Sequence, residues 1–249
     1  MGTLEGKTAV VTGGGTRGIG RATAARLAAE GAHVFITGRR EAELREAAES
    51  IGAAVTAVPG DITDPADLDR LYDLVRERGQ GLDVLFANAA TASFATLDQI
   101  TVEDFDRTFG VNVKGTLLTV QKALPHLNDG ASVILNASTN ADRGAAAFGL
   151  YAASKAAVRS FARTWASELT ARGIRVNAIS PGPIDTSGVT ELVGEENSAA
   201  YKAQIATQVP AGRIGRPEEV AAAVAFLASP ESGYVMGTNL YVDGGANQI

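Results

Sequence analysis

The chain has 249 residues, of which 45% are hydrophobic and 20% charged, and this length is enough to bury the core of one α/β domain. Its formal net charge is -6 and it has no block of Lys or Arg, which argues against nucleic acids and anionic membranes as partners. The absence of cysteine excludes disulfides, thiolate metal sites and cysteine nucleophiles. We therefore expect a single domain over residues 1–249 with a small-molecule ligand.

The start of the chain bears on where the protein works. Residues Met1 to Lys7 contain no apolar run that could act as a signal peptide. No later stretch has the roughly 18 apolar residues needed to span a bilayer. We expect a cytoplasmic protein.

Short apolar runs alternate with amphipathic segments along the whole chain. Strands are expected at Thr8 to Thr12, Ala32 to Thr37, Ala54 to Val58, Leu82 to Ala87, Ala131 to Ala137, Ile174 to Ile179 and Asn239 to Val242. Helices are expected at Gly20 to Glu30, Ala42 to Ser50, Pro65 to Arg78, Val102 to Leu127, Tyr151 to Ala171 and Pro217 to Leu227. This alternation predicts an α/β fold, a Rossmann-like doubly wound parallel sheet of about seven strands with helices on both faces.

The region from about Asp185 to Pro210 has the weakest pattern in the chain. It is rich in Gly, Glu, Ser and Ala and is bracketed by prolines. We expect a mobile loop that forms a substrate lid at about 185–210.

A glycine-rich turn, Thr12 to Gly20, directly follows the first strand and precedes a helix. Glycines in such a turn let the backbone approach a pyrophosphate, and the amides and dipole of the helix N-terminus meet its charge. The candidate dinucleotide-binding residues of this turn are Gly14, Thr16, Arg17, Gly18, Ile19 and Gly20.

The second strand ends at Gly38-Arg39-Arg40, and no carboxylate follows until Glu41. An acidic residue near this point would hold the ribose 2′-hydroxyl of NAD, whereas arginines suit the 2′-phosphate of NADP. With Arg17 they form a small basic cluster, so NADP(H) is the preferred cofactor and NAD(H) the alternative. In the alternative interpretation, Arg39 and Arg40 are solvated charges that lead into the next helix and bind no phosphate.

Polar residues end the third and fourth strands, at Asp61 and at Asn88-Ala89. In open α/β sheets the carboxyl ends of strands form the ligand crevice. Asp61 could equally cap the helix that begins near Asp64. Asn112 lies in a helical segment between two valines, which indicates that it is buried.

Three further side chains could carry chemistry. Ser138 ends the fifth strand, where its hydroxyl can hydrogen-bond a carbonyl or alkoxide. Tyr151 and Lys155 share one helix face, and a nearby cation lowers the pKa of a phenol so that it can exchange a proton. An isolated pair of this kind more often marks a surface. His33 and His126 are most simply structural, and we expect no metal site.

Taken together, these residues resemble the short-chain dehydrogenase/reductase family over essentially the whole chain. The resemblance rests on Gly14-x-x-x-Gly18-x-Gly20, Asn88-Ala89, Asn112, Ser138, Tyr151-x-x-x-Lys155, Pro181-Gly182 and Val242-Asp243-Gly244-Gly245. It implies a Rossmann-like sheet, a nicotinamide cofactor and the reversible interconversion of an alcohol with a ketone or aldehyde.

The resemblance also implies roles for the site residues. Tyr151 would be the general acid in reduction and the base in oxidation, and Lys155 would lower its pKa and hold the nicotinamide ribose. Ser138 would position the substrate oxygen, and Asn112 would retain a water that links Lys155 to solvent. Asp61 and Ile62 would contact the adenine. Asn88 and Ala89 would line the cofactor on its ribose side. The nicotinamide end would contact Pro181, Gly182, Ile184 and Thr186.

Two features depart from the family pattern. Four residues separate Gly13 from Gly18 where the family usually has three, so one glycine is extra and the role of Thr12 is left open. The consecutive glycines can absorb the insertion without a clash of β-carbons. The second departure is Ala90, where the family more often has glycine.

The resemblance implies a homotetramer, with the long helices at one interface and the C-terminal strand and tail at another. The segment from Tyr151 to Ala171 fits this, because it is small or apolar on more than one face, including Ala152, Ala156, Phe161 and Trp165. A helix buried within one subunit can show the same pattern.

The leading hypothesis is an NADP(H)-preferring oxidoreductase acting on a carbonyl or alcohol. Phe94, Phe148 and Val189 are candidate pocket walls, which suits a partly apolar substrate. The alternatives are a catalytically silent dinucleotide-binding regulator, the same reaction with NAD(H), and another Rossmann-type enzyme such as an epimerase or methyltransferase.

Overall fold

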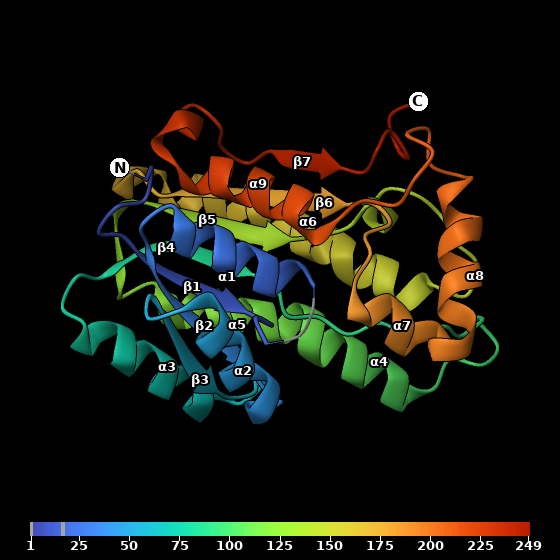
Figure 1. The fold of residues 1–249 in the computed structure, drawn as a ribbon, viewed down its shortest axis with the longest axis horizontal. Coiled ribbons are helices and arrows are strands. Elements are labelled where there is room, and N and C mark those ends of the chain that lie inside the picture. Colours follow the sequence, from blue (N-terminus) through green and yellow to red (C-terminus); the bar gives the residue numbers. More distant parts are fainter. Residues whose placement is uncertain (1, 16–17) are drawn as a thin grey trace.

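A parallel sheet of seven strands runs through the computed structural model, which describes residues 2–15 and 18–249 (Figure 1). The strand order is β3-β2-β1-β4-β5-β6-β7. The strands are β1 (Thr8–Thr12), β2 (His33–Gly38), β3 (Val55–Pro59), β4 (Leu82–Ala87), β5 (Leu127–Asn136), β6 (Arg175–Pro181) and β7 (Asn239–Val242). The predicted Rossmann-like doubly wound fold is confirmed.

Helices cover both faces of the sheet. They are α1 (Ile19–Ala29), α2 (Glu41–Ile51), α3 (Pro65–Glu77), α4 (Val102–Phe109), α5 (Thr116–Ala123), α6 (Gly149–Leu169), α7 (Ser187–Val193), α8 (Glu195–Ala206) and α9 (Pro217–Ala228). None of the described helices combines the length and apolar character needed to cross a membrane.

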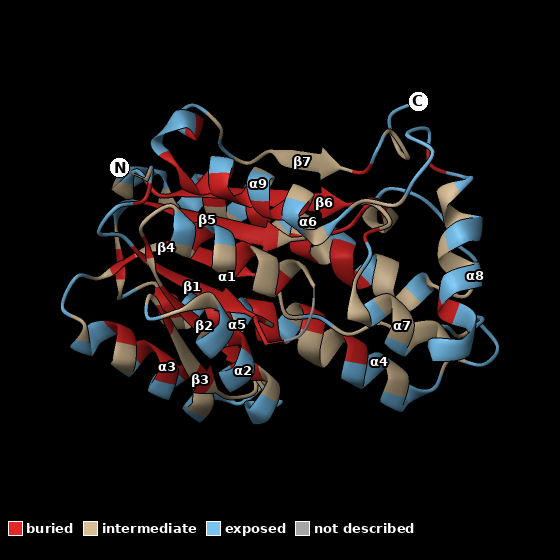
Figure 2. Ribbon diagram, in the orientation of Figure 1, coloured by how far each residue is buried: buried red, intermediate tan, exposed pale blue. Residues whose placement is uncertain are grey.

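Two hydrophobic cores form because successive strand residues point to opposite faces. In β1, Val10 joins the core under α3, α5 and α6, whereas Ala9 and Val11 join the core under α1, α2 and α9. Buried residues accordingly fill the sheet and the inner sides of the helices (Figure 2).

The glycine turn between β1 and α1 accommodates its extra residue through close backbone packing. Gly13 has a φ of 70°. A β-carbon at Gly14 would lie 2.8 Å from the Cβ of Ile36, and one at Gly20 would lie 2.2 Å from the carbonyl oxygen of Gly13. Both positions therefore require glycine for packing within the protein, and the approach of this backbone to a pyrophosphate stays a prediction.

The segment predicted as one helix from Val102 to Leu127 is interrupted, so that prediction was wrong in detail. A π-helix, η1 (Gly110–Gly115), separates α4 from α5, and Leu127 already belongs to β5. Asn112 sits in this wider turn and is 1% exposed, which confirms its predicted burial. A π-turn often marks a functional site because it re-aims the side chains within it.

The predicted loop at 185–210 is also wrong in form, since α7 and α8 occupy most of it. Both helices lie beyond the carboxyl end of β6, at one end of the sheet (Figure 1). Ser198 is the buried residue of α8. This helix has no broad apolar face, so its residues show no helical periodicity in the sequence.

Candidate functional site

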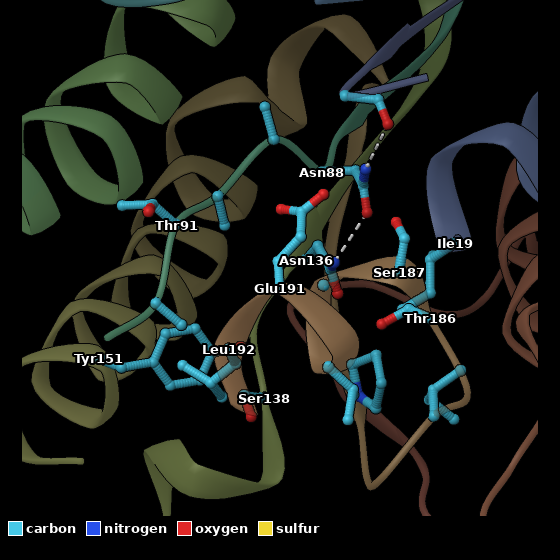
Figure 3. Close-up of a pocket in the computed structure, with 18 of the residues that line it drawn as sticks. Ile19, Asn88, Thr91, Asn136, Ser138, Tyr151, Thr186, Ser187, Glu191 and Leu192 are labelled. Carbon is cyan, nitrogen blue, oxygen red and sulfur yellow. Dashed lines mark hydrogen bonds between the residues drawn. The ribbon is translucent and has the colours of Figure 1, made fainter. Parts of the chain in front are cut away.

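A cavity of about 940 Å³ opens at the carboxyl ends of the strands (Figure 3). It extends over Arg39 after β2, Asn88 after β4, Tyr151 on α6 and Leu192 on α7. The predicted site residues that line it are Ile19, Arg39, Asp61, Ile62, Asn88, Ala89, Ser138, Tyr151, Pro181, Gly182, Ile184 and Thr186. Its volume lies at the upper end of the roughly 300–1,000 Å³ typical of ligand pockets, so it has room for an extended ligand.

Other predicted residues stand behind the cavity wall. Lys155 and Asn112 are buried, at 3% and 1% exposed, and contact the wall through hydrogen bonds described below. In the glycine turn Gly13 and Gly15 line the cavity, whereas Gly14, Gly18 and Gly20 do not. Two predicted phosphate-binding residues, Thr16 and Arg17, lie outside the described residues.

The arginines after β2 differ in their contacts. The guanidinium of Arg40 lies 3.1 Å from the carboxylate of Glu43 and 2.9 Å from that of Glu191 on α7. Arg39 lines the cavity and is exposed, and within the described ranges it makes no ion pair. Glu41 pairs with Arg45 at 2.6 Å. Arg39 therefore differs from its neighbour in being free to meet an anion in the cavity.

Asp61 lies at the cavity wall and does not cap α3. Its carboxylate accepts hydrogen bonds from the backbone N–H and the hydroxyl of Thr63, at 2.9 and 2.8 Å. Asp64 caps the helix by accepting from the N–H of Ala66 at 2.9 Å. The alternative role considered for Asp61 therefore belongs to Asp64.

Hydrogen bonds join the ends of β1, β4 and β5, and Figure 3 shows the one between Asn88 and Asn136. The side-chain amide of Asn88 donates to the carbonyl oxygen of Thr12 at 2.9 Å, and its Oδ1 accepts from Nδ2 of Asn136 at 2.9 Å. The hydroxyl of Thr12 accepts from the N–H groups of Asn88 and Ala89, at 2.9 and 3.0 Å. Thr12, whose role the extra glycine left open, thus fastens β1 to β4.

Asn136 is a site residue that the sequence analysis missed. Its carbonyl oxygen accepts from Nζ of Lys155 at 2.7 Å, and its side chain lines the cavity. Oδ1 of Asn136 is buried and has no hydrogen-bond partner among the described residues. The available signal was an asparagine at the end of an apolar strand, two residues before Ser138 and so on the same face.

Asn112 ties the π-helix to a loop and to α6. Its side-chain amide accepts from the N–H of Thr91 at 2.8 Å and donates to the carbonyl oxygen of Thr91 at 2.9 Å. It also donates to the hydroxyl of Ser154 at 3.0 Å. Since Ser154 precedes Lys155, these bonds help to hold the lysine-bearing turn of α6.

Ser138 and Tyr151 both line the cavity (Figure 3). The hydroxyl of Ser138 accepts from the N–H of Asn140 at 3.2 Å. A serine hydroxyl that already accepts a bond keeps its own proton for donation, for example to a carbonyl oxygen. The site can therefore present two hydroxyl groups to one oxygen atom of a ligand.

Burial controls the proton affinities of Tyr151 and Lys155. It raises the pKa of the Tyr151 phenol, an effect that the neighbouring hydroxyl of Ser138 partly offsets. It lowers the pKa of Lys155 to about 7. The sequence led us to expect a lowered pKa for Tyr151, but desolvation disfavours both charged forms and dominates here, although Nζ lies only 5.6 Å from the centre of the phenol ring.

The remaining predictions concern the apolar wall of the cavity and metal ligands. Phe94, Phe148 and Val189 all line the cavity. Across the described part of the chain, no group of three His, Asp or Glu side chains could hold a metal ion.

The chain is similar to known proteins over almost its full length. A family model described as Enoyl-(Acyl carrier protein) reductase matches residues 14–247. Oxidoreductase asL5 of Sarocladium schorii is 46% identical over 99% of this chain and 98% of its own length. Sorbitol dehydrogenase of Cereibacter sphaeroides is 39% identical over 97% of this chain and 98% of its own length. The crystal structure of 3-ketoacyl-(acyl-carrier-protein) reductase from Brucella melitensis complexed with NADH is 33% identical, with a TM-score of 0.90 over 98% of this chain and 99% of that chain.

The buried amine of Lys155 leads to a prediction about pH. Because its pKa is about 7 in the folded chain and near 10.5 when unfolded, the unfolded state binds more protons between these values. The contribution of Lys155 to the free energy of unfolding should therefore increase from pH 7 to pH 9 and be lost as pH falls through 7. Urea unfolding of the wild-type protein and Lys155→Met should show a stability difference, wild type minus variant, that rises over this range. A difference that is constant with pH would show that the amine is not desolvated.

Proposed function

The chain belongs to the short-chain dehydrogenase/reductase family, and we propose that it interconverts a ketone or aldehyde with the corresponding alcohol with NADP(H) as preferred cofactor. It is an NAD(P)-dependent enzyme that acts on CH–OH and C=O groups, as its dehydrogenase relatives indicate. The observation that carries the proposal is that Ser138 and Tyr151 line one large cavity, with Nζ of the buried Lys155 5.6 Å from the centre of the Tyr151 ring.

The residues of the cavity fit a nicotinamide dinucleotide. Its volume suits an extended ligand, and the buried Oδ1 of Asn136 is an acceptor in need of a donor. When bound, the reduced cofactor supplies a hydride to the carbonyl carbon of the substrate. We assign its adenine to Asp61 and Ile62, its ribose side to Asn88, Ala89 and Lys155, and its nicotinamide end to Pro181, Gly182, Ile184 and Thr186. Phosphate binding by the glycine turn, including Thr16 and Arg17, stays a prediction.

The protein's own groups then manage the proton. Ser138 donates a hydrogen bond to the substrate oxygen and places it beside the phenol of Tyr151. Tyr151 gives its proton to that oxygen in reduction and takes it back in oxidation. Lys155, held by the carbonyl oxygen of Asn136, stabilises the negative charge left on Tyr151 when it carries its own proton. Helices α7 and α8 supply Glu191, Leu192 and Tyr201 to the wall, and we propose that they act as the lid.

Removing the phenol oxygen tests the acid–base assignment. Tyr151→Phe should lower kcat by about 10²- to 10⁴-fold, because the substrate oxygen loses its proton donor. The dissociation constant for NADPH, followed by nicotinamide fluorescence, should change little. Substantial turnover by the variant would reject Tyr151 as the acid–base residue, and a wild-type protein that binds NADPH but reduces no ketone or aldehyde would favour the silent regulator.

Arg39 supports the preference for NADP(H). It lines the cavity at the end of β2 and is not engaged by a carboxylate in the described ranges, whereas Arg40 is paired. Arg39→Ala should weaken NADPH binding by about tenfold or more, because a charge-assisted hydrogen bond to the 2′-phosphate is lost, and should affect NADH little. Arg40→Ala is the matched control and should affect NADPH less. Equal effects of Arg39→Ala on both cofactors would remove the 2′-phosphate assignment.

Two observations favour NAD(H) instead. Glu191 lines the same cavity beside Arg40, and a carboxylate is the group that typically binds the ribose 2′-hydroxyl of NAD. The relative from Brucella melitensis was crystallised with NADH. Titration of the wild-type protein with both reduced cofactors decides between the two.

We also propose a homotetramer in which α4, α5 and α6 form one interface. Phe105 on α4 and Leu117 on α5 are exposed, and the small side chain of Ala156 on α6 is exposed as well. Apolar and small residues on adjacent helices suit close packing across a symmetry axis. Ala156→Glu should therefore lower the mass measured by light scattering from tetramer to a smaller species. Ala199→Glu, on the exposed side of α8, should leave the mass unchanged. A wild-type protein with the mass of a monomer would contradict the proposal.

A further inference from the structure

Four aromatic side chains form a continuous row from the acid–base residue to the proposed lid. The ring of Tyr151 stacks on Phe148, with centroids 4.5 Å apart and planes at 27°. Phe148 contacts Phe94 at 5.0 Å, and Phe94 meets Tyr201 edge-on at 6.5 Å. All four residues line the cavity, so the row forms part of the wall against which a substrate at Tyr151 would lie.

One member of the row is only half covered. Phe94 is 44% exposed although it lines a concave site. A large apolar ring that stays in contact with water gains favourable free energy when an apolar ligand covers it. Aromatic rings also prefer offset or edge contacts with other rings, so the best cover for this ring is another flat ring.

The loops that carry the row are tied to each other. Ala147 has a φ of 60°, the sole positive value among the non-glycine residues described. Its carbonyl oxygen accepts from the N–H of Ala95 at 2.8 Å, next to Phe94. The carbonyl oxygen of Phe148 accepts from the N–H of Ala152 at 3.0 Å and so begins α6. Strained backbone persists where its surroundings hold it, often at ligand sites, and here it fixes the spacing of Phe94 and Phe148.

An open-chain sugar or polyol would fit this wall poorly. Each hydroxyl group that leaves water needs a hydrogen-bond partner. Beside Tyr151 the row offers ring faces, and Val189 and Leu192 add apolar surface to the cavity. Polar residues also line the cavity, among them Asn140, Arg143, Lys202, Gln204 and Gln208. Of these, Arg143, Gln204 and Gln208 are exposed and suit substituents that remain in water.

We propose that the substrate is a ketone whose carbonyl group belongs to, or adjoins, a flat ring system that packs on Phe94 and Phe148. The inference rests on the proposed function. In the reaction the carbonyl carbon gains a hydride from the reduced dinucleotide and the oxygen gains the proton of Tyr151. The C=O π bond is lost, the product is a secondary alcohol, and the dinucleotide is oxidised.

The experiment compares 1-tetralone and 2-tetralone, as flat ring ketones, with L-erythrulose, a ketose too short to close into a hemiketal ring, in the presence of whichever reduced dinucleotide binds more tightly. We expect kcat/KM for the better tetralone to exceed that for erythrulose by about 100-fold or more. Phe94→Ala should lower kcat/KM for that tetralone by about tenfold, chiefly through KM, because ring contact area is lost. Its affinity for the dinucleotide should stay at the wild-type value. Phe226→Ala is the matched control, since Phe226 on α9 is 39% exposed and does not line the cavity.

The outcomes separate this inference from the proposed function. Preference for erythrulose, no turnover of either tetralone, or an unchanged KM in Phe94→Ala would overturn the ring-ketone inference and leave the dinucleotide site intact. Failure of the wild-type protein to bind NADPH and NADH would overturn both.

Discussion

The carboxyl ends of β1, β4 and β5 keep fixed positions because three residues bind one another in a set direction. A carbonyl oxygen can only accept a hydrogen bond, so that of Thr12 obliges Asn88 to present its NH₂ group to β1. The Oδ1 of Asn88 then faces β5 and obliges Asn136 to present its own NH₂ group. The side-chain oxygen Oδ1 of Asn136 is then left buried at the cavity wall, without a hydrogen-bond partner in the described ranges. The order of strands alone would not orient these amides. Lys155 also depends on Asn136, because its Nζ donates to the backbone carbonyl oxygen of that residue.

Burial gives the candidate acid–base pair its chemical character. In a dry site a lone phenolate or a lone ammonium is costly, but the two charges together compensate each other. In the protein alone, burial therefore favours the protonated form of Tyr151, the form that donates the proton in the proposed reduction. The proposed oxidation starts from the phenolate instead, so it depends more strongly on Lys155 carrying its proton.

The sequence predicted the sheet, its strands and part of the cavity wall, because these follow from local patterns of apolar and polar residues. Apolar runs located β1 and β4 at their observed bounds, and polar residues after strands pointed to Asp61, Asn88 and Ser138. What it missed depends on contacts between distant segments. The role of Asn136 needs Asn88 and Lys155 as neighbours, and the pKa of Tyr151 is set by how completely the fold buries it. Helix α8 escaped notice because its surface is mixed on all sides, and α4 and α5 were joined because a π-turn has the composition of a helix.

The π-turn of η1 also determines which side of α5 faces the core. Each residue of an α-helix turns the chain by about 100°, so one residue added within a helix swings everything after it by about that angle. With the wider turn of η1 in place, Val120 and Ala123 face the core while Asn112 reaches back to Thr91. Deleting one residue from the turn would leave the amount of helix almost unchanged, yet would rotate α5 off its packing surface and point a different side chain at Thr91. The length of this segment is therefore constrained as strictly as its residue identities, and the constraint would go unnoticed in a measurement of helix content.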